Sequence, residues 1–159
     1  MKSKQLQKLA LGAEIVSAIV VVATIGFLAV QTMENTNAVQ AQMFQELMRD
    51  LNDWRKMISR PDYSAIDKKY WQEGWGSLDY EEQRQFSITN NILWGIYESA
   101  YFANEREILG PTEWSRFQIA ICRRFSRDHL MWEQDAPTVR PVSQLLTAEF
   151  LEYVEGTCS

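Results

Sequence analysis

Glu14 is the only charged residue in the long apolar run Leu9–Val30. A carboxylate inside a membrane span costs free energy, about 2.5–3.5 kcal/mol at the bilayer centre for a residue such as Asp. Such residues usually face protein or water, because lipid cannot solvate the charge. We therefore expect Glu14 to contact a partner helix. Two alternatives stay open: a tolerated position near the membrane surface, and a carboxylate at the mouth of an ion-conducting assembly.

Small or polar residues recur every seven positions along the same stretch and beyond it: Ala10, Ser17, Thr24, Gln31, Ala38 and Gln45. On one helix such residues form a stripe that lets a neighbouring helix approach closely and form hydrogen bonds. We predict an intramembrane contact, named here the contact stripe, made by Glu14, Ser17, Thr24 and Gln31. Its partner is another membrane protein or a second copy of the chain.

Four arginines gather between residues 116 and 127: Arg116, Arg123, Arg124 and Arg127. Charged stripes on amphipathic helices are usually solvated or paired faces, so we expect pairing with acids such as Glu98 and Glu105. The alternative is that Arg116, Arg123 and Arg127 contact an acidic partner or lipid head groups.

The only histidine, His129, has Asp128 and Glu133 beside it in sequence. A zinc site needs three or four protein ligands, and no second cluster supplies the rest. Cys122 and His129 are seven residues apart, about two helical turns, which is too far for a catalytic dyad. Because no phosphate-binding glycine loop or serine elbow is present either, we expect no enzyme, no metal and no cofactor.

Cys122 and Cys158 match no zinc or redox motif. We expect both to be unpaired, Cys122 on an apolar helix and Cys158 in a frayed end. The alternative is a disulfide that ties down the C-terminal segment, if the domain faces an oxidising periplasm.

The apolar run is long enough to cross a bilayer as a helix, at 1.5 Å per residue. It is too long for an ordinary signal peptide, and no good cleavage site follows, so we expect a retained anchor. Lys2, Lys4 and Lys8 precede it, and the first basic residue after it is Arg49. This bias favours a cytoplasmic N-terminus and a periplasmic main domain at the bacterial inner membrane, with the opposite orientation left open.

Composition limits the partners of the rest of the chain. The 21 acidic residues outnumber the 16 basic ones, for a net charge of −5. Nucleic acid requires a basic surface, so we exclude it. We divide the chain into a basic tail (1–8), a transmembrane helix (9–30), a helical extension of the anchor (31–60) and a helical bundle domain (61–159).

Apolar residues at spacings of three and four predict helices throughout. The first is expected to run to about Ser59, the second to start at Ser64 and stop at Gly74, and the third to run from its cap Asp79, with Glu82 in a capping box, to Gly110. Further helices should start at Thr112 and Thr147, the last ending near Tyr153. The fold class is therefore all-α: an N-terminal transmembrane helix continuing into a long amphipathic helix, plus a small antiparallel bundle.

The aromatic residues Tyr70, Trp71, Trp75 and Tyr80 bracket a glycine-containing loop. We expect this loop to pack over the bundle, because aromatic side chains most often anchor cores. The alternatives are a small apolar pocket and a contact with the membrane interface.

Several segments carry a family resemblance: residues 12–24, Gln31, Asn35–Thr36, Ala38–Val39, 79–86, 98–101 and 149–154. In these, the chain resembles a group of small, uncharacterised bacterial proteins with one N-terminal span and a C-terminal helical domain. The resemblance covers most of the chain, but it implies no activity. Our main functional expectation is a membrane-anchored interaction protein, an accessory or scaffold subunit, with self-association as one form of the assembly. The alternatives are a homo-oligomeric channel using Glu14 and a ligand-sensing domain.

Overall fold

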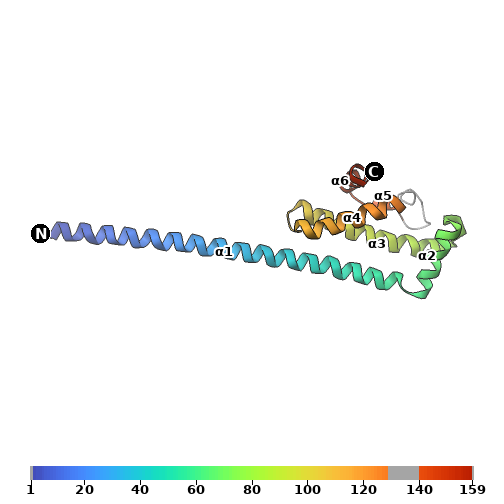
Figure 1. The fold of residues 1–159 in the computed structure, drawn as a ribbon, viewed down its shortest axis with the longest axis horizontal. Coiled ribbons are helices and arrows are strands. Elements are labelled where there is room, and N and C mark those ends of the chain that lie inside the picture. The colour runs from blue at the N-terminus through green and yellow to red at the C-terminus, as the bar shows by residue number, and fades with distance from the viewer. Residues whose placement is uncertain (1, 129–139, 159) are drawn as a thin grey trace. The chain divides into compact units, whose positions relative to one another are not determined.

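A computed structural model describes residues 2–128 and 140–158 (Figure 1). Its helices are α1 (Lys2–Ile58), α2 (Pro61–Glu73), the 3-10 helix η1 (Trp75–Ser77), α3 (Tyr80–Glu105), α4 (Pro111–Asp128), α5 (Val142–Leu145) and α6 (Ala148–Cys158). These two described stretches contain no strand. The all-α class predicted from the helical periodicity is confirmed.

The chain forms two compact units, residues 1–39 and residues 40–159. The first consists of the N-terminal part of α1. The second contains the remainder of α1 and every other helix, and both hydrophobic clusters lie entirely within it. Residues 40–58 therefore belong to the folded domain by their packing.

Within the second unit, α1 and α3 run antiparallel. The Nε1–H of Trp54 donates to the carbonyl of Thr89 at 2.9 Å, while the side-chain amide of Gln40 donates to the carbonyl of Glu107 at 3.2 Å. Trp54, near the end of α1, thus meets the first half of α3, while the earlier Gln40 meets a residue just beyond the end of α3. A helical hairpin with this direction needs a connection, which α2 and η1 supply.

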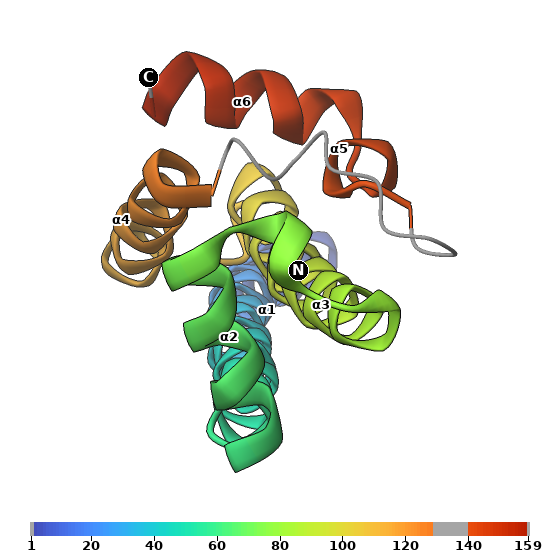
Figure 2. The same ribbon diagram turned by 90° about the vertical axis from the view of Figure 1, so that its right-hand side faces the viewer.

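Helix α4 runs antiparallel to α3 in the same way. Near one end Arg124 donates to the side chain of Asn90, and toward the other end the rings of Tyr101 and Trp114 lie 6.4 Å apart. In Figure 2, which looks along these helices, α6 lies across α3 and α4 rather than alongside them. The predicted antiparallel bundle is therefore confirmed, with α6 as its cover.

The core follows the apolar faces read from the sequence. On α3 the spacing of three and four in the sequence predicts one apolar face, and each of its positions is buried: Phe86, Leu93, Ile96, Tyr97, Ala100 and Tyr101. Leu47 of α1, Ile121 of α4 and Phe150 of α6 belong to the main cluster with the α3 residues from Leu93 onward, and Ile121 and Phe150 are fully buried. Each helix contributes one apolar stripe, as amphipathic helices around a shared core must.

A second, smaller cluster surrounds Phe86 at the start of α3. Tyr70 stacks on its ring at 4.5 Å, and Trp75 meets it edge-on at 6.2 Å. Tyr63 and Ile66 of α2 are buried beside it. The expectation that the aromatic loop packs over the bundle is confirmed for Tyr70 and Trp75.

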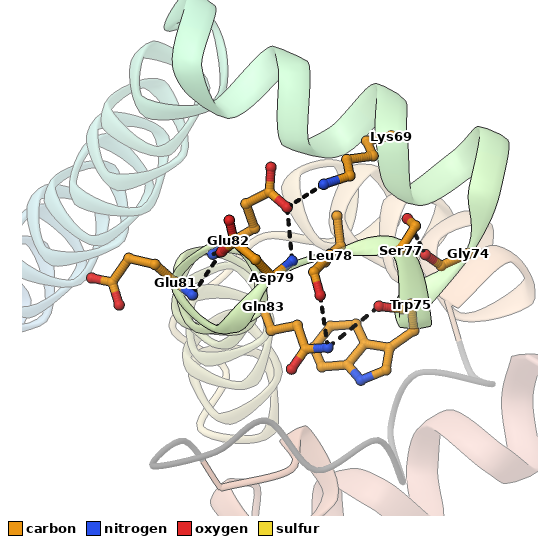
Figure 3. Close-up of polar contacts among 9 residues, drawn as sticks. All are labelled: Lys69, Gly74, Trp75, Ser77, Leu78, Asp79, Glu81, Glu82 and Gln83. Atoms are coloured by element: carbon orange, nitrogen blue, oxygen red, sulfur yellow. Dashed lines mark hydrogen bonds and ion pairs between the residues drawn. The ribbon is translucent and has the colours of Figure 1, made fainter.

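The capping box at the start of α3 forms as predicted (Figure 3). The carboxylate of Asp79 accepts from the backbone N–H groups of Glu81 and Glu82, both at 2.9 Å. The carboxylate of Glu82 accepts from the N–H of Asp79 at 2.8 Å. These bonds satisfy N–H groups that have no partner inside the helix.

Two predicted helix starts are wrong for the same reason. Helix α2 begins at Pro61, three residues before Ser64, and α4 begins at Pro111, one residue before Thr112. Proline suits the first helical position, because its fixed φ matches a helix and its missing N–H would be unpaired there. In each case the helix begins at the proline, ahead of the residue that the sequence predicts as its start, Ser64 or Thr112. The stop at Gly74 is correct, and Gly74 has a φ of 85°, which glycine adopts without strain.

Helix α3 ends earlier than predicted, at Glu105 rather than Gly110. The reversal falls at Glu107, which has a φ of 57°. The N–H groups of Ile108 and Leu109 both donate to the carbonyl of Ala103, at 2.8 and 3.2 Å. These bonds turn Leu109 inward, where it is 5% exposed. Burial of this leucine accounts for the early turn.

Helix α6 extends further than predicted, through Gly156 to Cys158. Thr147 precedes it, and its hydroxyl oxygen accepts from the N–H of Phe150 at 3.4 Å, as its predicted capping role requires. Cys158 is bonded to Cys122 of α4. The expectation of two unpaired cysteines is therefore wrong. Local signals predict that the helix ends near Tyr153. Packing against α4 and the disulfide keep residues 154–158 helical.

Candidate functional site

The contact stripe lies on the N-terminal unit. Glu14, Ser17, Thr24 and Gln31 are all exposed along α1. The hydroxyl of Thr24 donates to the carbonyl of Val20 at 2.7 Å, one turn earlier in its own helix. Its proton is thus already used, while its oxygen can still accept a hydrogen bond from a neighbouring helix. The carboxylate of Glu14 is the most polar group on this face.

The residues around the stripe are apolar and exposed. Nine of them between residues 16 and 30 are more than half exposed: Val16, Ile19, Val20, Val21, Val22, Ile25, Phe27, Leu28 and Val30. Among the described residues, one helix is long and apolar enough to cross a membrane, the Val16–Ile58 part of α1. Its most apolar 18-residue window has a mean hydropathy of 2.1 and no buried residue.

The bundle carries a different kind of site, built from the arginines of α4. Arg116, Arg123, Arg124 and Arg127 line a cavity of about 290 Å³, which we name the arginine cavity. Trp54 of α1 contributes to its wall. Arg116, Arg123 and Arg127 are exposed, and Arg124 is half-buried.

A chain of contacts fixes Arg124 in this cavity. Its guanidinium donates to the side-chain oxygen of Asn90 and lies over the ring of Trp54, 5.9 Å from the ring centre. Asn90 is 2% exposed, and its amide donates to the carbonyl of Phe86 at 2.9 Å. The Trp54 ring is held in turn by its bond to Thr89.

The predicted pairing of these arginines with acids of α3 is wrong. A carboxylate oxygen of Glu98 accepts from the backbone N–H of Thr147 at 2.6 Å, next to the start of α6. Among the described residues neither Glu98 nor Glu105 forms an ion pair, and neither do Arg116 and Arg123. The packing instead directs Arg124 toward Asn90 of α3 and Trp54 of α1, and Arg127 toward Trp71 of α2.

The sequence does not mark the aromatic and apolar residues of the arginine cavity as site residues; the two aromatic ones are Trp54 and Tyr97. From the sequence we interpret both as core residues, because each lies on the apolar face of its helix. The signal that marks them is weak: an aromatic residue at the border of an apolar stripe, with a polar atom on its edge and a ring face that can bind a cation. Only the tertiary packing shows that the edges of the apolar faces that carry Trp54 and Tyr97 lie next to α4.

The aromatic loop adds a contact to the same helix. Trp71 is 43% exposed and meets Tyr70 edge-on at 4.9 Å. The guanidinium of Arg127 lies 5.1 Å from the centre of the Trp71 ring. An arginine in this position is attracted by the negative face of the ring. Trp71 lies on α2, so this contact extends the arginine-bearing surface of α4 onto α2.

One ion pair beside the loop shifts two pKa values. The ammonium of Lys69 lies 2.6 Å from a carboxylate oxygen of Glu82 (Figure 3). This hydrogen bond lowers the pKa of Glu82, with help from the N–H of Asp79, and it raises the pKa of Lys69. In the core, burial raises the pKa of Tyr101 and of Tyr153. The first two pKa shifts come from an ion pair between α2 and α3, and the last two come from burial in the core.

The part of the chain that the structure describes holds no group of three or more His, Cys, Asp or Glu side chains placed to bind a metal ion. His129 and Glu133, considered above as ligands, lie outside the described residues. No family model, curated protein or solved structure matches the chain. The resemblance to single-span bacterial proteins stays a prediction.

Proposed function

We propose that this chain is a membrane-anchored, all-helical interaction protein, with α1 as its single-pass anchor and residues 40–159 as its partner-binding domain. The observation that carries the proposal is the run of exposed apolar side chains between residues 16 and 30. An exposed apolar surface of this length is unfavourable in water. A bilayer removes it from water without a tertiary partner.

The disulfide supports an orientation for the proposed anchor. Cys122 and Cys158 form a disulfide. Disulfides persist in oxidising compartments and are rare in cytosolic proteins. The three lysines before the span favour a cytoplasmic N-terminus. Both observations favour a bundle in the periplasm of a bacterial cell, anchored in the inner membrane.

The contact stripe supports an assembly role within the bilayer. Glu14, Ser17 and Thr24 place polar atoms on a helix that is otherwise apolar. A carboxylate in this setting gains from a partner that donates a hydrogen bond or carries a positive charge. We propose an accessory or scaffold subunit of a larger membrane assembly, with self-association as the simplest variant.

The experiment is native mass analysis of the protein extracted from its own membrane in mild detergent, with identification of whatever co-purifies. The expected result is a defined complex larger than a monomer. Glu14→Leu and Thr24→Leu should weaken it, and the conservative Ile19→Leu, on another face of α1, should not. A monomer in which all three variants behave alike would contradict the stripe.

The composition of the complex separates the two leading alternatives. A complex with other proteins supports the accessory-subunit proposal, and the identity of those proteins shows in which cellular process the chain takes part. A complex of this chain alone favours the homo-oligomeric channel. In that case pure protein in liposomes should conduct ions, and Glu14→Gln should change the conductance.

A further inference from the structure

We propose that the arginine cavity binds a small organic anion: a phosphate or carboxylate group joined to an apolar or aromatic body. The cavity lies wholly within residues 40–159, so the proposal does not depend on the membrane anchor or on the contact stripe. It concerns a ligand, whereas the proposed function concerns protein partners.

The charge of the cavity is the first step of the argument. Four of its lining side chains are arginines, and none of its lining residues is acidic. This occurs in a chain whose net charge is −5. Arg116 and Arg123 form no ion pair with any residue that the structure describes. Guanidinium groups stay charged and match the oxygens of carboxylate and phosphate with paired donors.

The position of Arg124 is the second step. Its contacts with Asn90 and Trp54 order the side chain whether or not a ligand is present. Binding costs less conformational entropy when a recognition group is already in place. Arg116 and Arg123, which are exposed, can then close on an anion from the same helix.

The apolar wall is the third step, and it indicates more than a bare inorganic ion. Leu93 and Tyr97 of α3 line the cavity, and Ile119 lines it while 65% exposed. The volume of about 290 Å³ lies at the small end of the range for ligand pockets. It suits a single ring or a short chain next to the charged group.

Two other cavities of similar size differ in charge, because acidic residues line them. One of about 280 Å³ shares Trp54, Arg124 and Arg127 with the arginine cavity, but Asp67 also lines it. Another, of about 410 Å³, is lined by Glu46 and Asp50. A negative side chain in the wall repels an anion, so charge favours the arginine cavity over these two.

The test is a calorimetric titration of phenyl phosphate into the full-length protein, held in nanodiscs of phosphatidylcholine, a lipid without net charge. Saturable one-to-one binding is expected. The double variant Arg116→Gln/Arg123→Gln should raise the Kd by about tenfold or more, because charge-assisted hydrogen bonds are lost. Both residues are exposed, so the thermal unfolding midpoint of the variant should match that of the parent protein.

The matched control is Arg49→Gln/Arg84→Gln, which removes the same charge from two arginines that do not line the cavity. Both of these arginines lie in surface ion pairs with Asp50 and Glu81. The control should change the Kd by no more than about twofold, as expected for screened surface charges. An equal loss in the two double variants, or no saturable binding of phenyl phosphate or benzoate, would overturn the proposal.

A lipid arm identifies the natural source of the anion. The titration is repeated in nanodiscs that contain phosphatidylglycerol. Weaker apparent binding of phenyl phosphate there, with no such change in the Arg116→Gln/Arg123→Gln variant, supports the site with a lipid head group as the anion. Unchanged binding supports the site with a soluble anion.

Discussion

Asp79 and Glu82 show how much a few side chains determine at the residue scale. Their reciprocal bonds fix the start of α3, the helix that every other part of the bundle packs against. Glu82 also holds Lys69 of α2, so the same carboxylate joins two helices. Arg124 has a comparable role on α4, since it links a buried asparagine to an indole ring.

Asp79→Ala should lower the free energy of unfolding of the bundle by about 1 kcal/mol, within about 0.5–2 kcal/mol, because the cap of α3 is lost. Urea denaturation followed by tryptophan fluorescence measures it. Thr112→Ala is the control: the sequence suggests a cap there, but α4 already begins at Pro111. Its effect should stay below about 0.5 kcal/mol. Equal losses in the two variants would show that the capping box is not special.

The Lys69–Glu82 pair predicts a dependence of stability on pH. The pKa of Glu82 is lowered from its usual 4.5 in the folded protein, so its contribution is complete above that value and disappears as the pH falls through the lowered pKa. The pKa of Lys69 is raised from 10.5, so its contribution is complete below that value and is lost as the pH rises further. Glu82→Gln should therefore flatten the acid limb of a plot of the denaturation midpoint against pH. An unchanged acid limb would refute the pair's role.

At the element scale, α6 is attached to the bundle by covalent and aromatic contacts. The disulfide joins it to α4 across 36 residues of sequence. Tyr153 lies 5.8 Å from the ring of Trp114 and 4.8 Å from that of Tyr101. An 11-residue helix is marginal alone, so these contacts, rather than helix propensity, keep it folded.

Reduction of the disulfide should lower the free energy of unfolding by about 2–4 kcal/mol, because an open loop gives the unfolded chain more freedom. Denaturation with and without a reductant measures the change. The Cys122→Ser/Cys158→Ser variant should unfold near the midpoint of the reduced protein and should not respond to reductant. A reductant effect that persists in this variant would point to another cause.

On the scale of the whole molecule, the chain combines two kinds of surface. The N-terminal unit exposes apolar side chains, and the unit of residues 40–159 buries its own in two clusters. A unit that contains its complete core has what it needs to fold alone.

A fragment of residues 40–159 should therefore be water-soluble and monomeric, with the helical circular dichroism and the disulfide of the full chain. The full chain should need detergent. Fractionation and the measured mass of the fragment test this expectation. A fragment that aggregates or unfolds would show that residues 1–39 stabilise the bundle directly.

The sequence by itself determined the five longer helices but not η1 and α5, because spacings of three and four, a glycine stop and a capping box are local signals. It also marked the apolar run, since length and hydropathy need no tertiary information. Helix starts at Pro61 and Pro111 were misjudged, as two local signals competed within a few residues. The contact stripe can be read from the heptad spacing, and its role stays a prediction.

Only the tertiary structure decided which residues meet across the bundle. Cys122 and Cys158 are 36 residues apart, and nothing local brings them together. The arginines were expected to face the acids of α3, and instead they form a cavity with Trp54 of α1. An amphipathic helix defines which face is apolar. The neighbour that each polar edge meets depends on the direction and rotation of the packed helices, which the packing of all the side chains fixes together.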